Sequence, residues 1–187
     1  MDSQALMILI AAVVLAIVVF GVYAYVMRRR REQLRHRFGP EYDRTLAQAG
    51  DPARADAILA KRLDRVDRFK LRPLSREQAD SFAREWQRVQ GRFVDDPNAA
   101  VSEADQLVER VMASCGYPTD DFDRLADDVS VDHPHVVENY RTARALMARR
   151  ASGEVQTEEL RQAVVNYRAL FNDLLEVEKP HHQRRAS

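Results

Sequence analysis

Two histidines and two carboxylates lie close together around Pro134 and are the best candidates for a metal site. Imidazole nitrogens and carboxylate oxygens are common zinc ligands. His135 and Glu138 would share one face of a helix because they are three residues apart, and Asp132 and His133 precede the proline. A metal site would need further ligands and supporting hydrogen bonds, and a turn with polar ends explains the same pattern. We keep His133, His135 and Glu138 as candidate ligands beside that simpler interpretation.

The same region offers the best support for an enzyme with an unfamiliar site, in a pocket formed by Asp132, His133, His135 and Tyr140. No Gly-rich phosphate loop, paired CxxC, HExxH or GxSxG motif occurs in the sequence. We therefore predict no cofactor, and we expect a non-enzymatic protein.

An acidic run and a lone cysteine are the other groups that could do chemistry. The run consists of Asp120, Asp121, Asp123, Asp127, Asp128 and Asp132. It fails the spacing of a calcium-binding EF-hand loop because no Gly lies at the turn and no Glu closes it, so we expect a solvated helix face. Cys115 ends a helical stripe of apolar residues, which is typical of a buried, unreactive thiol. Trp86 is expected to be a core residue.

These residues follow an N-terminal stretch that predicts a transmembrane helix. Ala5 to Met27 are 23 residues without a charge, and a helix of that length spans about 34 Å, enough to cross a bilayer. A cleaved signal peptide would have a basic start and a shorter apolar stretch. A core helix of a soluble domain would show a polar face, which this stretch lacks. We expect residues 1–4 to form a short external N-terminus.

Six arginines follow the span within ten residues: Arg28, Arg29, Arg30, Arg31, Arg35 and Arg37. Because basic residues beside a span stay on the cytoplasmic side, they predict an outward N-terminus and a cytoplasmic C-terminal domain. They are also expected to contact anionic lipid headgroups. Ala12 and Ala16 form one small-xxx-small pair, which leaves a homo-oligomer open.

The rest of the chain predicts one acidic helical domain. Residues 38–178 contain 20 basic and 27 acidic residues, a net charge of about −7. Such a domain is poorly suited to nucleic acid, whose phosphates are bound by Lys and Arg. Residues 28–40 form a basic juxtamembrane segment with a hinge at Gly39 and Pro40, residues 41–178 form the cytoplasmic domain, and residues 179–187 form a disordered basic tail.

Periodicity and capping signals predict only helices in this domain. Five long segments repeat apolar residues at helical spacing, and Asp51, Ser75, Asp96, Pro134 and Thr157 mark their starts. The first runs to about Lys70 and the third ends at Cys115 before Gly116. Two shorter helices are expected at 41–49 and between Gly116 and Pro134. The fold class is therefore all-α: a transmembrane helix followed by a compact, bundle-like domain of about five to six helices.

Several segments resemble an uncharacterised group of bacterial proteins with one N-terminal span and a helical domain. They are RFGPEYDR at 37–44, RPLS at 72–75, RFVDDP at 92–97, GYP at 116–118 and VDHP at 131–134. The resemblance implies a place in the bacterial inner membrane but no activity, ligand or functional residue. Two hypotheses follow: a membrane-tethered interaction or scaffold module that holds a protein partner, and an enzyme or metal-binding protein with its site near Pro134.

Overall fold

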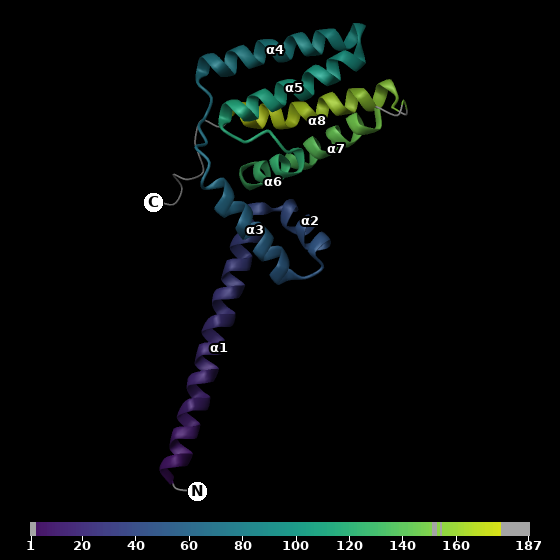
Figure 1. Ribbon diagram of the computed structural model, residues 1–187. Helices are drawn as coiled ribbons and strands as arrows, with labels where there is room; N and C mark the ends of the chain where they lie inside the picture. The colour runs from purple at the N-terminus through teal and green to yellow at the C-terminus, as the bar shows by residue number, and fades with distance from the viewer. Residues whose placement is uncertain (1–2, 151–152, 154, 177–187) are drawn as a thin grey trace.

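The computed structural model describes residues 3–150, 153 and 155–176, and the described residues fold entirely into helices without a strand (Figure 1). The helices are α1 (Ser3–Phe38), α2 (Pro40–Ala49), α3 (Pro52–Val66), α4 (Arg76–Asp95), α5 (Pro97–Cys115), α6 (Phe122–Asp132), α7 (Val137–Arg150) and α8 (Thr157–Leu175). The all-α prediction is confirmed. In the described part, seven helices follow α1, rather than the expected five to six. The predicted basic tail at 179–187 lies outside the described residues.

Local capping chemistry explains where most helices begin. The Asp51 side chain accepts a hydrogen bond from the Arg54 backbone N–H at 2.9 Å, with Pro52 as the first helical residue. Ser75 and Gln78 form a capping box, in which each side chain accepts from the backbone N–H of the other residue. These starts confirm the sequence signals.

Three helix ends differ from the predictions for identifiable reasons. α3 stops at Val66 rather than Lys70 because the next two turns use tighter bonds, from Arg68 N–H to Arg65 O and from Phe69 N–H to Val66 O. α7 begins at Val137, since a turn closed on the His133 carbonyl separates it from Pro134. The cap of α8 is Gln156, not Thr157, and its backbone N–H donates to Glu159 at 3.0 Å.

A large core lies among α4, α5, α7 and α8, with one face of α6. The predicted anchor Trp86 is 4% exposed and stacks on Phe171, with ring centroids 4.7 Å apart. The α5 face of small residues, which includes Ala100 and Ala104, lets neighbouring helices approach closely. This core forms the body of the domain.

A second, small core joins the end of α1 to the domain. It consists of Leu34, Phe38, Tyr42, Leu59, Val66 and Val131. These residues come from α1, α2, α3 and α6, and α6 therefore contributes to both cores. The chain bends at Gly39, which has a positive φ of 47°, at the position where the sequence suggests a hinge. Side chains on both sides of that bend are buried in the same core.

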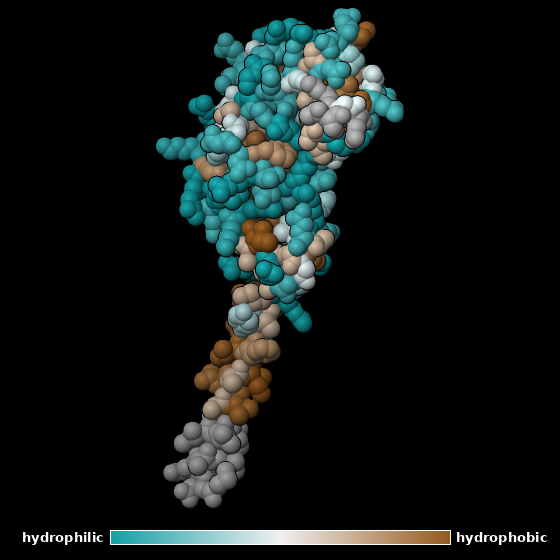
Figure 2. All heavy atoms as spheres, turned by 45° about the vertical axis from the view of Figure 1, so that its right-hand side comes forward, coloured by the Kyte–Doolittle hydropathy of each residue, from teal (hydrophilic) through white to brown (hydrophobic). Residues whose placement is uncertain are grey.

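Residues 11–27 of α1 extend away from the domain and are largely apolar (Figure 2). From Val13 to Met27, the large apolar residues are exposed, and Phe20 reaches 72%. This is the one helix in the described residues that is long and apolar enough to cross a membrane, and its length and composition also fit a signal sequence.

Candidate functional site

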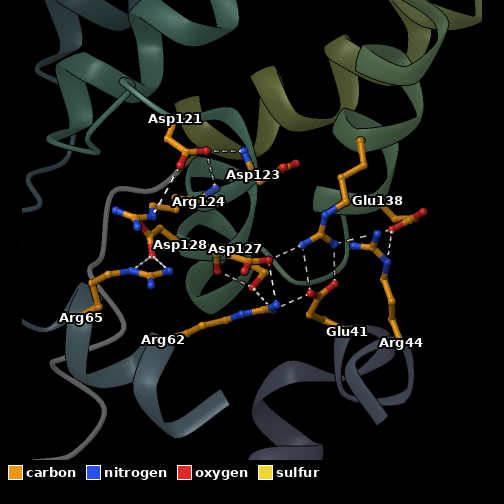
Figure 3. A network of polar contacts seen from close by, with 12 residues as sticks. Glu41, Arg44, Arg62, Arg65, Asp121, Asp123, Arg124, Asp127, Asp128 and Glu138 are labelled. Atoms are coloured by element: carbon orange, nitrogen blue, oxygen red, sulfur yellow. Dashed lines mark hydrogen bonds and ion pairs between the residues drawn. The ribbon is translucent and has the colours of Figure 1, made fainter. Parts of the chain in front are cut away.

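The most unusual feature of the domain is a set of buried charges where α2, α3, α6 and α7 meet (Figure 3). The Glu41 carboxylate accepts a hydrogen bond from Arg62 at 2.6 Å and two from Arg141, at 2.6 and 3.0 Å. The Glu41 side chain is only 2% exposed, Arg62 7% and Arg141 11%. One carboxylate thus binds two guanidinium groups almost out of contact with water.

α6 completes this arrangement with a second carboxylate. Asp127 lies 2.7 Å from Arg62 and 3.1 Å from Arg141, so the two acids and two arginines alternate in a ring. We call Glu41, Arg62, Asp127 and Arg141 the Glu41 cluster. Ser130 extends it by accepting from Arg62 at 3.3 Å. Because the positive and negative charges balance, the cluster can stay ionised despite its burial.

A separate pair lies beside the cluster. Arg65 of α3 lies 2.5 Å from Asp128 of α6, whose side chain is 4% exposed. The acidic run is therefore not a simple solvated face. Asp121 caps α6, and Asp127, Asp128 and Asp132 bind arginines.

The electrostatics of Glu41 follow from two opposing effects. Burial raises the pKa of its carboxyl group, but the hydrogen bonds and charges of Arg141 and Arg62 outweigh burial and lower the pKa below its ordinary value. Burial likewise acts to lower the pKa of Arg141, yet Glu41 and Asp127 raise it. Both groups therefore stay charged near neutral pH. Glu41 and Arg141 therefore act as permanently charged groups whose ion pairs hold the helices together.

The predicted metal ligands point to different partners. His133 Nδ1 lies 2.5 Å from Asp173 Oδ2 on α8. Asp132 accepts a hydrogen bond from the Tyr117 hydroxyl at 3.0 Å and lies 3.7 Å from Arg37. Asp132 and His133, at the end of α6, therefore bind residues in different parts of the chain.

The other two candidates are also separated from them. The His135 ring lies against Gly39, with Cε1 3.2 Å from the place a Cβ would occupy there. Glu138 faces Arg44 at 3.5 Å and Arg141 at 3.6 Å. Within the described residues, no three His, Cys, Asp or Glu side chains are arranged to hold a metal. Tyr140 is buried in the large core beside Phe122.

The juxtamembrane arginines divide into two groups. Arg31 donates to Asp56 at 3.0 Å, Arg35 lies over the Tyr42 ring at 5.2 Å, and Arg37 pairs with Asp132. By contrast, the exposed side chains of residues 28–30 form no ion pair with the described residues. The first group holds α1 to the domain, and the second is available to other molecules.

Cys115 is buried as predicted, and burial raises the pKa of its thiol to about 11, which disfavours the nucleophilic thiolate. Comparison of the chain with protein families, curated proteins and solved structures found no match.

Proposed function

We propose that this protein is a single-pass membrane protein that presents a helical interaction domain at the cytoplasmic face of the bacterial inner membrane. The observation that carries the proposal is the continuity of α1. Its exposed apolar part runs without a break into a last turn where Leu34 and Phe38 are buried in the domain. A domain fixed in this way is held at a set distance and orientation from the bilayer.

Charge supports the proposed orientation. Arg28, Arg29 and Arg30 lie directly after the apolar stretch and are exposed, as expected for residues at the cytoplasmic headgroups. We also place the protein in the bacterial group that its sequence resembles.

The surface of the α4–α5 hairpin supports an interaction role. A groove between these helices is lined mainly by charged and polar side chains, with Val89 and Leu107 among the lining residues: Glu85, Arg88, Val89, Arg92, Glu103, Gln106, Leu107 and Arg110. Arg92 pairs with Glu103 and Arg110 with Glu85 across it. Such a surface is suited to a polar protein partner, including a second copy of the chain.

Membrane topology is the first test. A reporter that is active only outside the cytoplasm, fused after Leu175, should be inactive, and the same reporter fused before Ser3 should be active. Full-length protein should stay in the membrane pellet after alkaline extraction with its N-terminus intact. A soluble product that begins after Met27 would show instead that the apolar helix is a cleaved signal.

The interaction role needs a separate experiment. Full-length protein would be cross-linked in cells and purified in detergent beside a variant with Arg88→Glu, which reverses one charge in the groove. We expect a partner that is enriched by the parent and lost with the variant. The absence of any enriched partner, or equal recovery by both, would contradict a partner surface on α4 and α5.

A further inference from the structure

The outer face of α3 carries an exposed surface that is basic and partly apolar. Arg54, Ile58 and Lys61 follow one another at steps of four and three residues, which places them on one side of the helix. All three are exposed, and Ile58 is 39% exposed. Neither cationic side chain forms an ion pair with the described residues. We call Arg54, Ile58 and Lys61 the α3 outer face.

α3 lies at the end of the domain from which α1 emerges (Figure 1). Asp56 holds α3 beside α1, because it accepts hydrogen bonds from Arg31 at 3.0 Å and from the Tyr42 hydroxyl at 2.9 Å. Among the helices, α2, α3 and α6 contact α1. The start of α3 is thus held beside the arginines of α1.

The distance from the apolar span brings this part of α3 near the lipid headgroups. Arg31 comes four residues after Met27, a rise of about 6 Å along the helix. The headgroup layer on each side of a bilayer is roughly 5 to 7 Å thick. The contact between Arg31 and Asp56 therefore lies at the outer edge of that layer, within reach of long side chains from α3.

We propose that the α3 outer face rests on anionic lipid headgroups and acts together with Arg28, Arg29 and Arg30. This inference rests on the proposed membrane anchor. Five cations without an ion pair to the described residues would then face lipid phosphates, which attract Lys and Arg near a membrane surface. Ile58 lies between two of them on the same side of α3 and contacts the headgroup layer with them. The domain is thereby seated on the bilayer by one defined side.

Depth-dependent fluorescence quenching tests this arrangement in the full-length protein. A single cysteine carrying a fluorophore would replace Ile58 in a Cys115→Ala background and be compared with cysteines at Val94 and Leu15. Val94 is 84% exposed on α4, and Leu15 is an exposed residue of the apolar part of α1. Each protein would be reconstituted in vesicles of phosphatidylcholine, alone or mixed with phosphatidylglycerol, containing lipid with a nitroxide on its headgroup or deep in its acyl chain.

We expect headgroup nitroxide to quench the probe at position 58 several-fold more than the probe at 94 in anionic vesicles, and less strongly in neutral ones. Combined Arg54→Gln and Lys61→Gln substitutions should reduce the headgroup quenching at position 58 to the level seen at position 94. Arg76→Gln with Arg84→Gln, which removes two exposed arginines of α4, should leave the quenching at position 58 unchanged.

The probe in the apolar stretch separates this inference from the proposed anchor. If deep nitroxide quenches position 15 but headgroup nitroxide quenches 58 no more than 94, the contact of α3 with lipid is wrong and the anchor stands. If position 15 is not quenched, the anchor itself is wrong. Equal quenching of 58 in neutral vesicles would refute the role of charge, and insensitivity to the α3 substitutions would refute the role of these residues.

Discussion

Glu41 is the residue on which the arrangement of the domain depends most. Its carboxylate is nearly inaccessible to water and binds Arg62 of α3 and Arg141 of α7. Replacing a whole buried ionic group by well-packed apolar residues is often neutral, whereas removing one partner leaves the others charged and unpaired. The Glu41 cluster therefore fixes how α2, α3, α6 and α7 meet more than it adds net stability.

The substitution Glu41→Ala should destabilise the domain strongly. It leaves two buried guanidinium groups that share only Asp127, and we expect a loss of about 3 kcal/mol in the free energy of unfolding. The control is Glu138→Ala, because Glu138 contacts the same Arg141 but is 60% exposed, and it should cost less than about 1 kcal/mol. Denaturant titration followed by Trp86 fluorescence measures both. Equal losses would show that burial of Glu41 has no special effect.

The lowered pKa of Glu41 predicts a pH dependence of stability. Since the carboxyl group has a lower pKa when folded than when unfolded, its stabilising contribution is complete above the unfolded pKa and disappears as pH falls through the folded value. The parent protein should therefore exceed Glu41→Gln in unfolding free energy at neutral pH. The difference should shrink steadily as the pH is lowered below about 4.5. A difference that stays constant through acid pH would contradict the paired state of Glu41.

Single-sequence reasoning could not find this cluster. Glu41 looks like an ordinary acid in the first turn of a helix, where the helix dipole favours negative charge. Its partners are 21 and 100 residues away, and helical periodicity carries no information about such distant contacts. The histidines near Pro134 stood out only because they are close in sequence, and the structure turns them to separate neighbours.

At the scale of the elements, predictions succeeded where the cause is local. The Ser75 capping box and the end of α5 at Gly116 each depend on residues within one turn, so the sequence reveals them. The predicted start of α7 at Pro134 was wrong, because the actual start at Val137 follows a turn closed on the His133 carbonyl. The connection from α3 to α4 was also beyond prediction, since it packs on the end of α5, where Arg72 N–H donates to Cys115 O at 3.0 Å.

Gly116 is required by that connection as well as by the helix end. Its φ is 98°, and a Cβ at this position would lie 2.9 Å from the Lys70 carbonyl oxygen. Gly116→Ala should cost about 2 kcal/mol or more, because it combines an unfavourable backbone conformation with a clash against backbone. Gly50→Ala is the matched control, since Gly50 has a φ of 70° but open space around it. If thermal unfolding shows the same loss for both, contact with the connection is unimportant.

At the scale of the whole molecule, two cores share one helix. α6 places Leu125 and Val129 in the large core and Val131 in the small one. The Glu41 cluster links α2 and α3, which contribute to the small core, to α7, which contributes to the large one. The small core is built around Phe38, which is fully buried although it belongs to the helix that carries the apolar stretch. The apolar helix and the domain are therefore one folded unit.

Phe38→Ala should loosen the small core selectively. Removing a buried phenyl ring costs about 3 to 5 kcal/mol, and the loss falls on the helices that contact it. We expect hydrogen exchange to accelerate in α2 and α3, while α5 and α8, within the large core, keep their protection. Val94→Ala, at an exposed site on α4, should leave hydrogen exchange unchanged in both groups of helices. Uniform acceleration throughout the domain would mean that the two cores unfold as a single cooperative unit.

The unbroken α1 has a mechanical consequence. A helix of 36 residues is a stiff rod about 54 Å long, and its end is clamped by Phe38 in the small core. For an anchored chain, a bilayer that thins or thickens changes the tilt of the rod. Because α1 is continuous from the apolar stretch to Phe38, a change in the tilt of α1 turns the domain with it. In an anchored protein, the angle between the bundle and the bilayer would therefore follow the thickness of the membrane.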